Sequence, residues 1–113
     1  MNRKLFAMLA KEVPEYASRD AYISDMALSS IWGDVPDDEI PAERLEQLGM
    51  VWDAVNRPVS EIVKSTGLSQ AAFANLHLIP LRTIENWCTG SRECRLYDRI
   101  FLQEAVGLLH LEN

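Results

Sequence analysis

Residues 68–90 read LSQAAFANLHLIPLRTIENWCTG, and they carry the most specific structural signals in the chain. Ser69 is a good helix N-cap, because its side-chain oxygen can accept a hydrogen bond from a backbone N–H of the first turn. The residues that follow are strong helix formers, with Phe73 as the apolar anchor that faces inward. The pattern predicts a short helix that begins after Ser69.

A second helix is predicted over about residues 80–89, after a break in the pattern. Pro80 suits the start of a helix, where its missing N–H would have no partner within the helix. Ile84 and Trp87 are three residues apart, which puts them on one helix face. Gly90 is typical of the position after a helix C-terminus, because glycine tolerates a positive φ.

Two short helices joined by a tight turn, the second with polar side chains beside an apolar row, form a helix-turn-helix. The runs LSQAAFA and IPLRTIENW, with the glycine that follows, resemble the phage-repressor (XRE-type) family over about residues 59–110. The resemblance implies a lambda-repressor-like core and sequence-specific DNA binding, as in a transcriptional regulator of a bacterium or a mobile element. It also implies that the helix at about residues 80–89 enters the major groove of double-stranded DNA.

The resemblance, followed residue by residue, implies that Leu81, Arg82 and Asn86 face base edges. Their chemistry agrees with this placement. Arginine can donate two hydrogen bonds to guanine O6 and N7, and asparagine can pair bidentately with adenine N6 and N7. Leu81 offers only an apolar contact, for example to a thymine methyl group.

The same resemblance implies a set of contacts to the phosphate backbone. Ser69 and Gln70 would lie at the backbone, and Arg92 and Arg95 follow the second helix where the family's loop approaches phosphates. An arginine there positions the domain without reading sequence. Thr83 is either a phosphate contact or a packing residue, and each arginine has the alternative of an ordinary solvated side chain.

The chain departs from the family at two places. Leu78 stands where the turn usually carries a glycine, which implies either that the turn needs no positive φ or that it is strained. Glu93 and Cys94 follow Arg92 where family members often have further basic residues. This second departure predicts weak phosphate binding.

The net charge of −6 also counts against strong DNA binding, because proteins that neutralise phosphates usually have a basic surface. Residues 1–57 hold six basic and eleven acidic side chains, and residues 58–113 hold five and six. A DNA surface would therefore depend on a local arrangement of arginines, namely Arg82, Arg92, Arg95 and Arg99. The alternative is a protein-interaction module, antitoxin-like or phage-borne, that keeps a helix-turn-helix core with weak or no DNA binding.

The rest of the chain also has helical patterns. Apolar residues recur at helical spacing, and prolines and the acidic segment 33–41, which has the composition of a loop, interrupt them. Further helices are expected at about residues 3–12, 18–32, 41–56, 60–66 and 95–110. The sequence predicts an all-α fold, a compact bundle of about six to seven helices, in a single domain over residues 1–113.

Within this domain, residues 1–57 are expected to form an acidic helical part that buttresses the fold or pairs subunits. Residues 58–113 would hold the helix-turn-helix core and the C-terminal helix. The helix at about 95–110 is apolar on more than one face, so it is either buried or partly used in self-association. A homodimer would suit the family, because two recognition helices about 34 Å apart can read a palindromic site.

Catalytic and metal-binding motifs are not found in the sequence. Cys88 and Cys94 are separated by five residues and the two histidines are scattered, which is not the spacing of a structural zinc site. A three-ligand site that includes His77 remains conceivable. Without a serine elbow, a phosphate loop or paired catalytic carboxylates, we expect neither enzymatic activity nor a cofactor.

Composition and hydropathy indicate a folded protein of the cytoplasm. A hydrophobic content of 48% with 25% charged residues lies far from the composition of disordered chains. The apolar run at residues 5–10 is too short for a signal peptide, and no run approaches the length of a membrane span. We expect no membrane partner.

Overall fold

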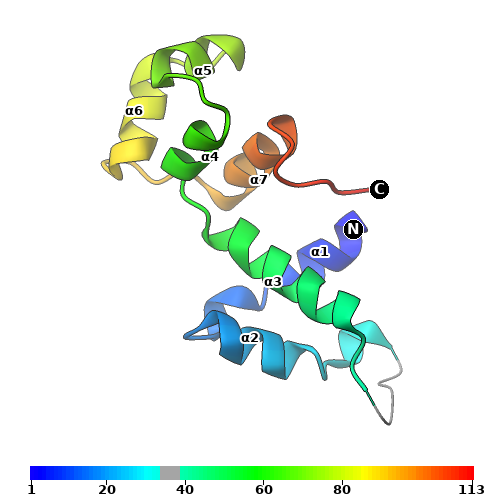
Figure 1. Ribbon diagram of the computed structural model, residues 1–113. Helices are drawn as coiled ribbons and strands as arrows, with labels where there is room; N and C mark the ends of the chain where they lie inside the picture. Colours follow the sequence, from blue (N-terminus) through cyan, green and yellow to red (C-terminus); the bar gives the residue numbers. More distant parts are fainter. Residues whose placement is uncertain (34–38) are drawn as a thin grey trace. The chain divides into compact units, whose positions relative to one another are not determined.

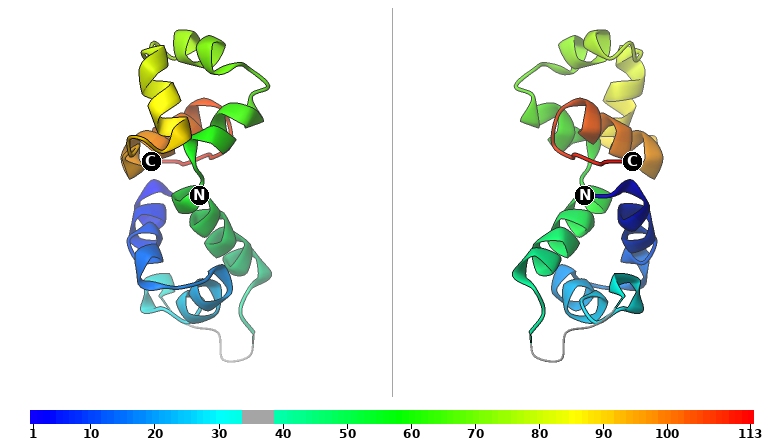
Figure 2. Two further views of the ribbon diagram at one scale, coloured as in Figure 1. Left: turned by 90° about the vertical axis from the view of Figure 1, so that its left-hand side faces the viewer. Right: turned by 90° about the vertical axis from the view of Figure 1, so that its right-hand side faces the viewer.

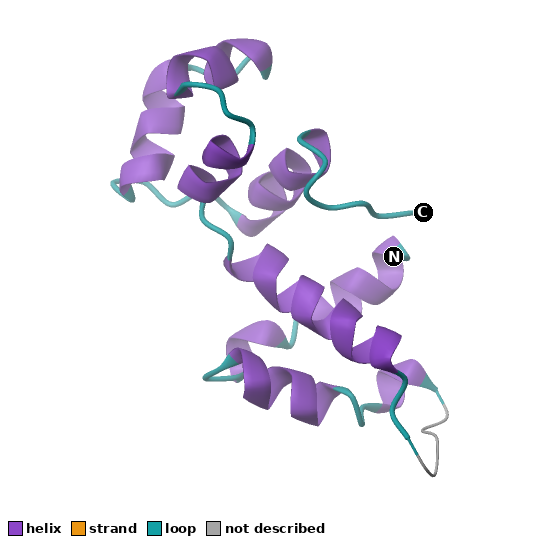
Figure 3. Ribbon diagram, in the orientation of Figure 1, coloured by secondary structure: helices purple, strands orange, loops and turns teal. Residues whose placement is uncertain are grey.

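Helices make up the regular secondary structure of the computed structural model, which describes residues 1–33 and 39–113. Within these ranges, seven α-helices and two short 3-10 helices follow one another and no strand is formed (Figures 1 and 3). The predicted all-α fold class is therefore confirmed. The lambda-repressor-like core stays a prediction.

The contacts within the chain gather in two compact units rather than in one continuous cluster. Unit 1 comprises Met1–Asn56 and His110–Asn113, and unit 2 comprises Arg57–Leu109. The sequence predicted one domain, with its acidic and helix-turn-helix parts meeting between residues 57 and 58. The last four residues return to unit 1, where the backbone N–H of Arg3 donates to the carbonyl of Glu112 at 2.7 Å. The chain therefore passes between the units twice.

Three α-helices and two 3-10 helices form unit 1: α1 (Arg3–Ala10), η1 (Val13–Glu15), α2 (Arg19–Met26), η2 (Ser30–Trp32) and α3 (Ala42–Asn56). The helix predicted at about 18–32 is wrong in its extent, because α2 ends at Met26. Ser29 then accepts a hydrogen bond from the N–H of Ile31 at 3.2 Å, which caps the separate η2. Serine side chains that bind nearby backbone groups compete in this way with a continuous helix.

The other boundaries in unit 1 lie close to the predicted ones. α1 ends at Ala10 instead of about residue 12, and Pro14 lies inside η1, where its missing N–H is tolerated. α3 begins at Ala42, one residue after the predicted start at about 41. The loop expected over 33–41 falls mainly on residues 34–38, which lie outside the described residues.

The core of unit 1 forms where α1 and α2 pack against α3. Tyr22 is fully buried, and its hydroxyl donates to the carbonyl of Leu9 at 2.8 Å, so the buried phenol keeps a hydrogen-bond partner. The ring of Tyr22 lies 5.5 Å from that of Trp52. On α3, Leu48 is buried, whereas Leu45 is exposed.

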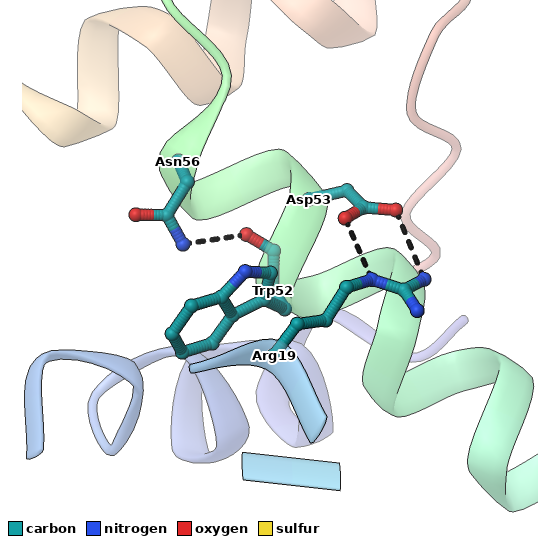
Figure 4. A network of polar contacts seen from close by, with 4 residues as sticks. All are labelled: Arg19, Trp52, Asp53 and Asn56. Carbon is teal, nitrogen blue, oxygen red and sulfur yellow. Dashed lines mark hydrogen bonds and ion pairs between the residues drawn. The ribbon is translucent and has the colours of Figure 1, made fainter. Parts of the chain in front are cut away.

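A surface ion pair connects α2 with α3 in unit 1. Arg19 Nε and Nη2 donate to the two carboxylate oxygens of Asp53 at 3.0 and 3.2 Å, and the Asn56 amide donates to the carbonyl of Trp52 at 2.9 Å (Figure 4). The guanidinium group occupies the space beside Gly49 that a Cβ would fill. Because both partners are nearly half exposed, solvent screens the pair and it contributes little to stability.

Four α-helices form unit 2: α4 (Val59–Ser65), α5 (Gln70–Leu76), α6 (Leu81–Thr89) and α7 (Leu96–Ala105). α6 packs against both α4 and α5 (Figure 2). The core consists of buried side chains from all four helices and the loop before α7: Val59, Ile62, Val63, Phe73, Ala74, Ile84, Cys94 and Leu102. The predicted anchors Phe73 and Ile84 are both fully buried, as expected.

The last helix is shorter than predicted. α7 spans Leu96–Ala105 instead of about 95–110, and Gly107, with φ at 83°, ends it. The backbone N–H of Leu108 turns back to the carbonyl of Gln103 at 2.9 Å, which is typical of a helix that ends in a left-handed residue. One side of α7 is buried, whereas Tyr97 and Phe101 form an exposed edge-on aromatic pair with centroids 6.4 Å apart.

Arg99 is used inside unit 2, which corrects its place among the arginines expected at a DNA surface. Its guanidinium donates to the carbonyls of Cys94 at 3.3 Å and of Arg57 at 3.1 Å. Arg57 in turn donates to Oε1 of Gln103 at 2.6 Å, and Gln103 is fully buried. These bonds join α7 to the segment before α4, so the guanidinium of Arg99 holds the fold of unit 2 together.

Candidate nucleic-acid interface

The start of α5 is fixed by the predicted cap. The hydroxyl of Ser69 accepts a hydrogen bond from the N–H of Ala72 at 3.1 Å, while Phe73 and Ala74 are buried against the core. Ser69 and Gln70 are both exposed. These two predicted phosphate contacts therefore lie next to each other at the solvent side of the α5 N-terminus.

The turn between α5 and α6 is a tight one. The N–H of Leu78 donates to the carbonyl of Asn75 at 3.3 Å, and the N–H of Ile79 donates to the carbonyl of Ala74 at 2.9 Å. This pair of bonds is the Schellman motif, which requires a left-handed residue after the helix. Leu78 fills that position with φ at 56°.

Leu78 therefore resolves the choice that the sequence left open, because the turn does need a positive φ. A left-handed conformation costs an L-residue roughly 1–2 kcal/mol, and bulky side chains rarely adopt it. The side chain is 91% exposed, so burial of the leucine compensates little of this cost. The turn keeps a strained residue where glycine would relieve the strain.

We expect Leu78→Gly to raise the free energy of unfolding by about 0.5–1 kcal/mol, because relief of the strain exceeds the extra chain entropy of glycine. Leu76→Gly is the matched control. It makes the same substitution two residues earlier, at the last residue of α5, and should lower the free energy by up to about 1 kcal/mol. Urea denaturation of the three proteins measures both values. A loss of stability in Leu78→Gly would contradict the strained turn.

α6 has two distinct faces. Ile84 is fully buried, and Trp87 and Cys88 pack against the core of unit 2. Leu81 and Arg82 are exposed in the first turn. The spacing of the anchors turns one side of α6 toward the core and leaves the N-terminal residues to solvent.

Thr83 and Asn86, the other two predicted contacts on α6, are both partly buried. Asn86 is in contact with the loop that follows the helix. Its side-chain oxygen accepts a hydrogen bond from the hydroxyl of Ser91 at 3.1 Å, and its backbone carbonyl accepts one from the N–H of Arg92 at 3.3 Å. Ser91 was missed by the sequence reasoning, since only the folded loop brings it to Asn86.

The two predicted phosphate-side arginines differ in their surroundings. Both are exposed. Arg92 lies within the loop between α6 and α7, and Arg95 is the last residue of this loop, directly before α7. Arg95 donates to the hydroxyl of Tyr97 at 3.0 Å, and this bond raises the pKa of the Arg95 guanidinium above its ordinary value. Arg95 is thus directed along α7, whereas Arg92 follows Ser91 beside α6.

The charge of the chain is divided unevenly between the two units. Unit 2 has six basic and five acidic side chains, a net charge of +1, and unit 1 has five and twelve, a net charge of −7. All eight candidate residues belong to unit 2. The acidity that counted against DNA binding is therefore a property of the unit that lacks these residues.

The two thiols have the properties of packing residues. Burial raises the pKa of Cys88, and burial together with Asp98 raises the pKa of Cys94 to about 11. Both thiols are therefore protonated at neutral pH, although the thiolate is the nucleophile and the metal ligand. Within residues 1–33 and 39–113, no three side chains of His, Cys, Asp or Glu gather in a way that could hold a metal ion.

The helices also differ from membrane-spanning ones. In the described part of the chain, none is both long and apolar enough to cross a bilayer.

Comparison of the chain with protein-family models, with curated proteins and with solved structures finds no match.

Proposed function

We propose that the chain is a sequence-specific DNA-binding protein, a transcriptional regulator of a bacterium or a mobile element, whose α6 lies in the major groove. The observation that carries the proposal is the two-faced α6. Ile84 and Trp87 hold the helix against the core, while Leu81 and Arg82 project from its first turn. A recognition helix needs this combination, because its N-terminal residues must reach base edges from a rigid support.

The flanking residues fit contacts to phosphates on either side of such a helix. Ser69 and Gln70 are exposed at the start of α5, and Arg92 follows α6. Each neutralised phosphate contributes about 0.9 to the slope of log affinity against log salt concentration. With Arg92 and Arg95 as phosphate contacts, we expect a shallow slope of about −2 for each bound chain.

The proposal is tested by selection of bound fragments from random double-stranded DNA at low salt, followed by sequencing. We expect one enriched motif, whose affinity falls with salt along the shallow slope. The full chain is used, so that the acidic unit 1 is present in the assay. Failure to enrich any motif at low salt would refute sequence-specific binding.

A protein-interaction module is the second candidate, favoured by the apolar surface at the turn. Leu76 is 66% exposed and Leu78 is more exposed still, while the whole chain carries a net charge of −6. This function predicts a protein partner at fixed stoichiometry whose binding is lost in Leu76→Ser combined with Leu78→Ser and kept in Arg82→Ala. The DNA-binding function predicts that DNA binding is weakened in Arg82→Ala and kept in the double serine variant. It requires no protein partner.

A further inference from the structure

A chain of three hydrogen bonds determines how the side chain of Asn86 is oriented. The hydroxyl of Thr89 donates to the hydroxyl oxygen of Ser91 at 3.2 Å, and the hydroxyl of Ser91 donates to Oδ1 of Asn86 at 3.1 Å. The N–H of Ser91 also lies 3.5 Å from the Thr89 hydroxyl oxygen, to which it donates. The single proton of the Ser91 hydroxyl has two acceptors on Asn86, Oδ1 at 3.1 Å and the backbone carbonyl at 3.4 Å, and Oδ1 is the nearer one.

This orientation changes what Asn86 can offer to a base. Bidentate recognition of adenine needs the amide oxygen to accept from N6 and the amide nitrogen to donate to N7. In this structure the amide oxygen is turned toward Ser91. The NH₂ group is the other arm of the same planar amide, so the arm that does not accept from Ser91 is a donor.

We propose that Ser91 is a positioning residue that fixes Asn86 as a hydrogen-bond donor, so that α6 reads a guanine at this position instead of an adenine. The inference rests on the proposed DNA binding. In the major groove, guanine presents two acceptors, N7 and O6, whereas adenine presents N7 beside the donor N6. The NH₂ group of Asn86 can donate to either acceptor of guanine. At adenine it can donate to N7, but it lies beside the N6 amino group, which is also a donor.

The substitution Ser91→Ala removes the hydroxyl that holds the amide oxygen, so the amide can rotate and pair with adenine. The preference for guanine over adenine at the affected position should fall by roughly 2- to 10-fold, the range of one neutral hydrogen bond. Ser91→Thr keeps the hydroxyl and should retain the preference. Because neither substitution changes a charge, the salt dependence of binding should be the same in all three proteins.

The experiment first selects the motif with the wild-type chain and locates the base pair whose preference is lost in Asn86→Ala. Affinities are then measured for two duplexes that differ only at this pair, G·C or A·T, with the wild-type chain, Ser91→Ala and Ser91→Thr. A third duplex carries 7-deazaguanine there, which lacks the N7 acceptor. We expect it to bind the wild-type chain more weakly than the guanine duplex and to bind Asn86→Ala equally well.

Several results would overturn the inference while leaving DNA binding intact. The first is that the wild-type chain prefers adenine at the base pair whose preference is lost in Asn86→Ala. The second is that Asn86→Ala loses the preference at no base pair. The third is that Ser91→Ala keeps the preference for guanine unchanged. If Ser91→Ala fails to fold, the wild-type and 7-deazaguanine measurements still test whether Asn86 reads a guanine, and a preference for adenine still overturns the inference. If the wild-type chain enriches no motif, the proposed function fails, and the inference falls with it.

Discussion

Phe73→Ala should lower the free energy of unfolding by about 3–5 kcal/mol, the largest effect expected of any substitution considered for this chain. Phe73 is fully buried in the core of unit 2, and its ring lies 4.3 Å from that of His77, which follows α5. Truncation to alanine removes the transfer free energy of the ring and leaves a cavity among close-packed neighbours. Urea denaturation monitored by circular dichroism measures the loss.

Leu76→Ala is the matched control for this prediction. It also deletes an apolar side chain from α5, three residues further on, but Leu76 is largely exposed. Its effect should stay within about 0.5 kcal/mol, as is usual for surface substitutions. Equal losses in the two variants would mean that α5 does not pack through Phe73 as the structure describes.

The helices of unit 2 could be predicted from the sequence because their signals are local. Ser69 caps α5 and Gly90 ends α6 through hydrogen bonds and backbone angles within a few residues. Phe73 and Ile84 stand out as anchors because apolar side chains at helical spacing need a buried face. These signals do not depend on the rest of the fold.

The exception within this region is the turn. The sequence could say that Leu78 lacks the freedom of a glycine, but not whether the turn required it. That depends on where the chain must go after α5, because Ile79 packs into the core of unit 2. The left-handed angle at Leu78 is therefore set by tertiary packing and overrides the residue's own preference.

The assignments that changed involve partners distant in the sequence. Arg99 was counted with the solvent-facing arginines, yet it binds the carbonyl of Arg57, 42 residues away. The buried Gln103 accepts from Arg57 across 46 residues. A pattern of residue types along one helix holds no information about such partners, so only the folded structure separates an arginine open to solvent from one that holds the fold.

The candidate site shows the same division between local and distant signals. The exposure of Arg82 follows from the helical period, because it lies on the face opposite Ile84. The orientation of Asn86 does not, since it depends on the loop that brings Ser91 back to α6. Sequence reasoning therefore predicted that Arg82 is exposed, but not that Ser91 contacts the amide oxygen of Asn86.

Arg82→Ala should weaken binding to the selected DNA motif by about 10- to 100-fold, which corresponds to about 1–3 kcal/mol for a bidentate contact to guanine. It should also abolish the base preference at one position of the motif. Binding to random DNA should weaken much less. There the substitution removes only the positive charge of Arg82, whereas on the selected motif it also removes a specific contact to a base edge. Fluorescence anisotropy on motif and scrambled duplexes measures the two affinities.

Lys11→Ala is the control for the lost positive charge. Lys11 is exposed beyond the end of α1 and belongs to unit 1, so its removal changes the net charge of the chain by the same amount without touching α6. We expect its base preferences to equal those of the wild-type chain. If Arg82→Ala weakened motif and scrambled DNA equally, Arg82 would be a phosphate contact and not a reader of bases. Unchanged binding in Arg82→Ala would remove Arg82 from the interface.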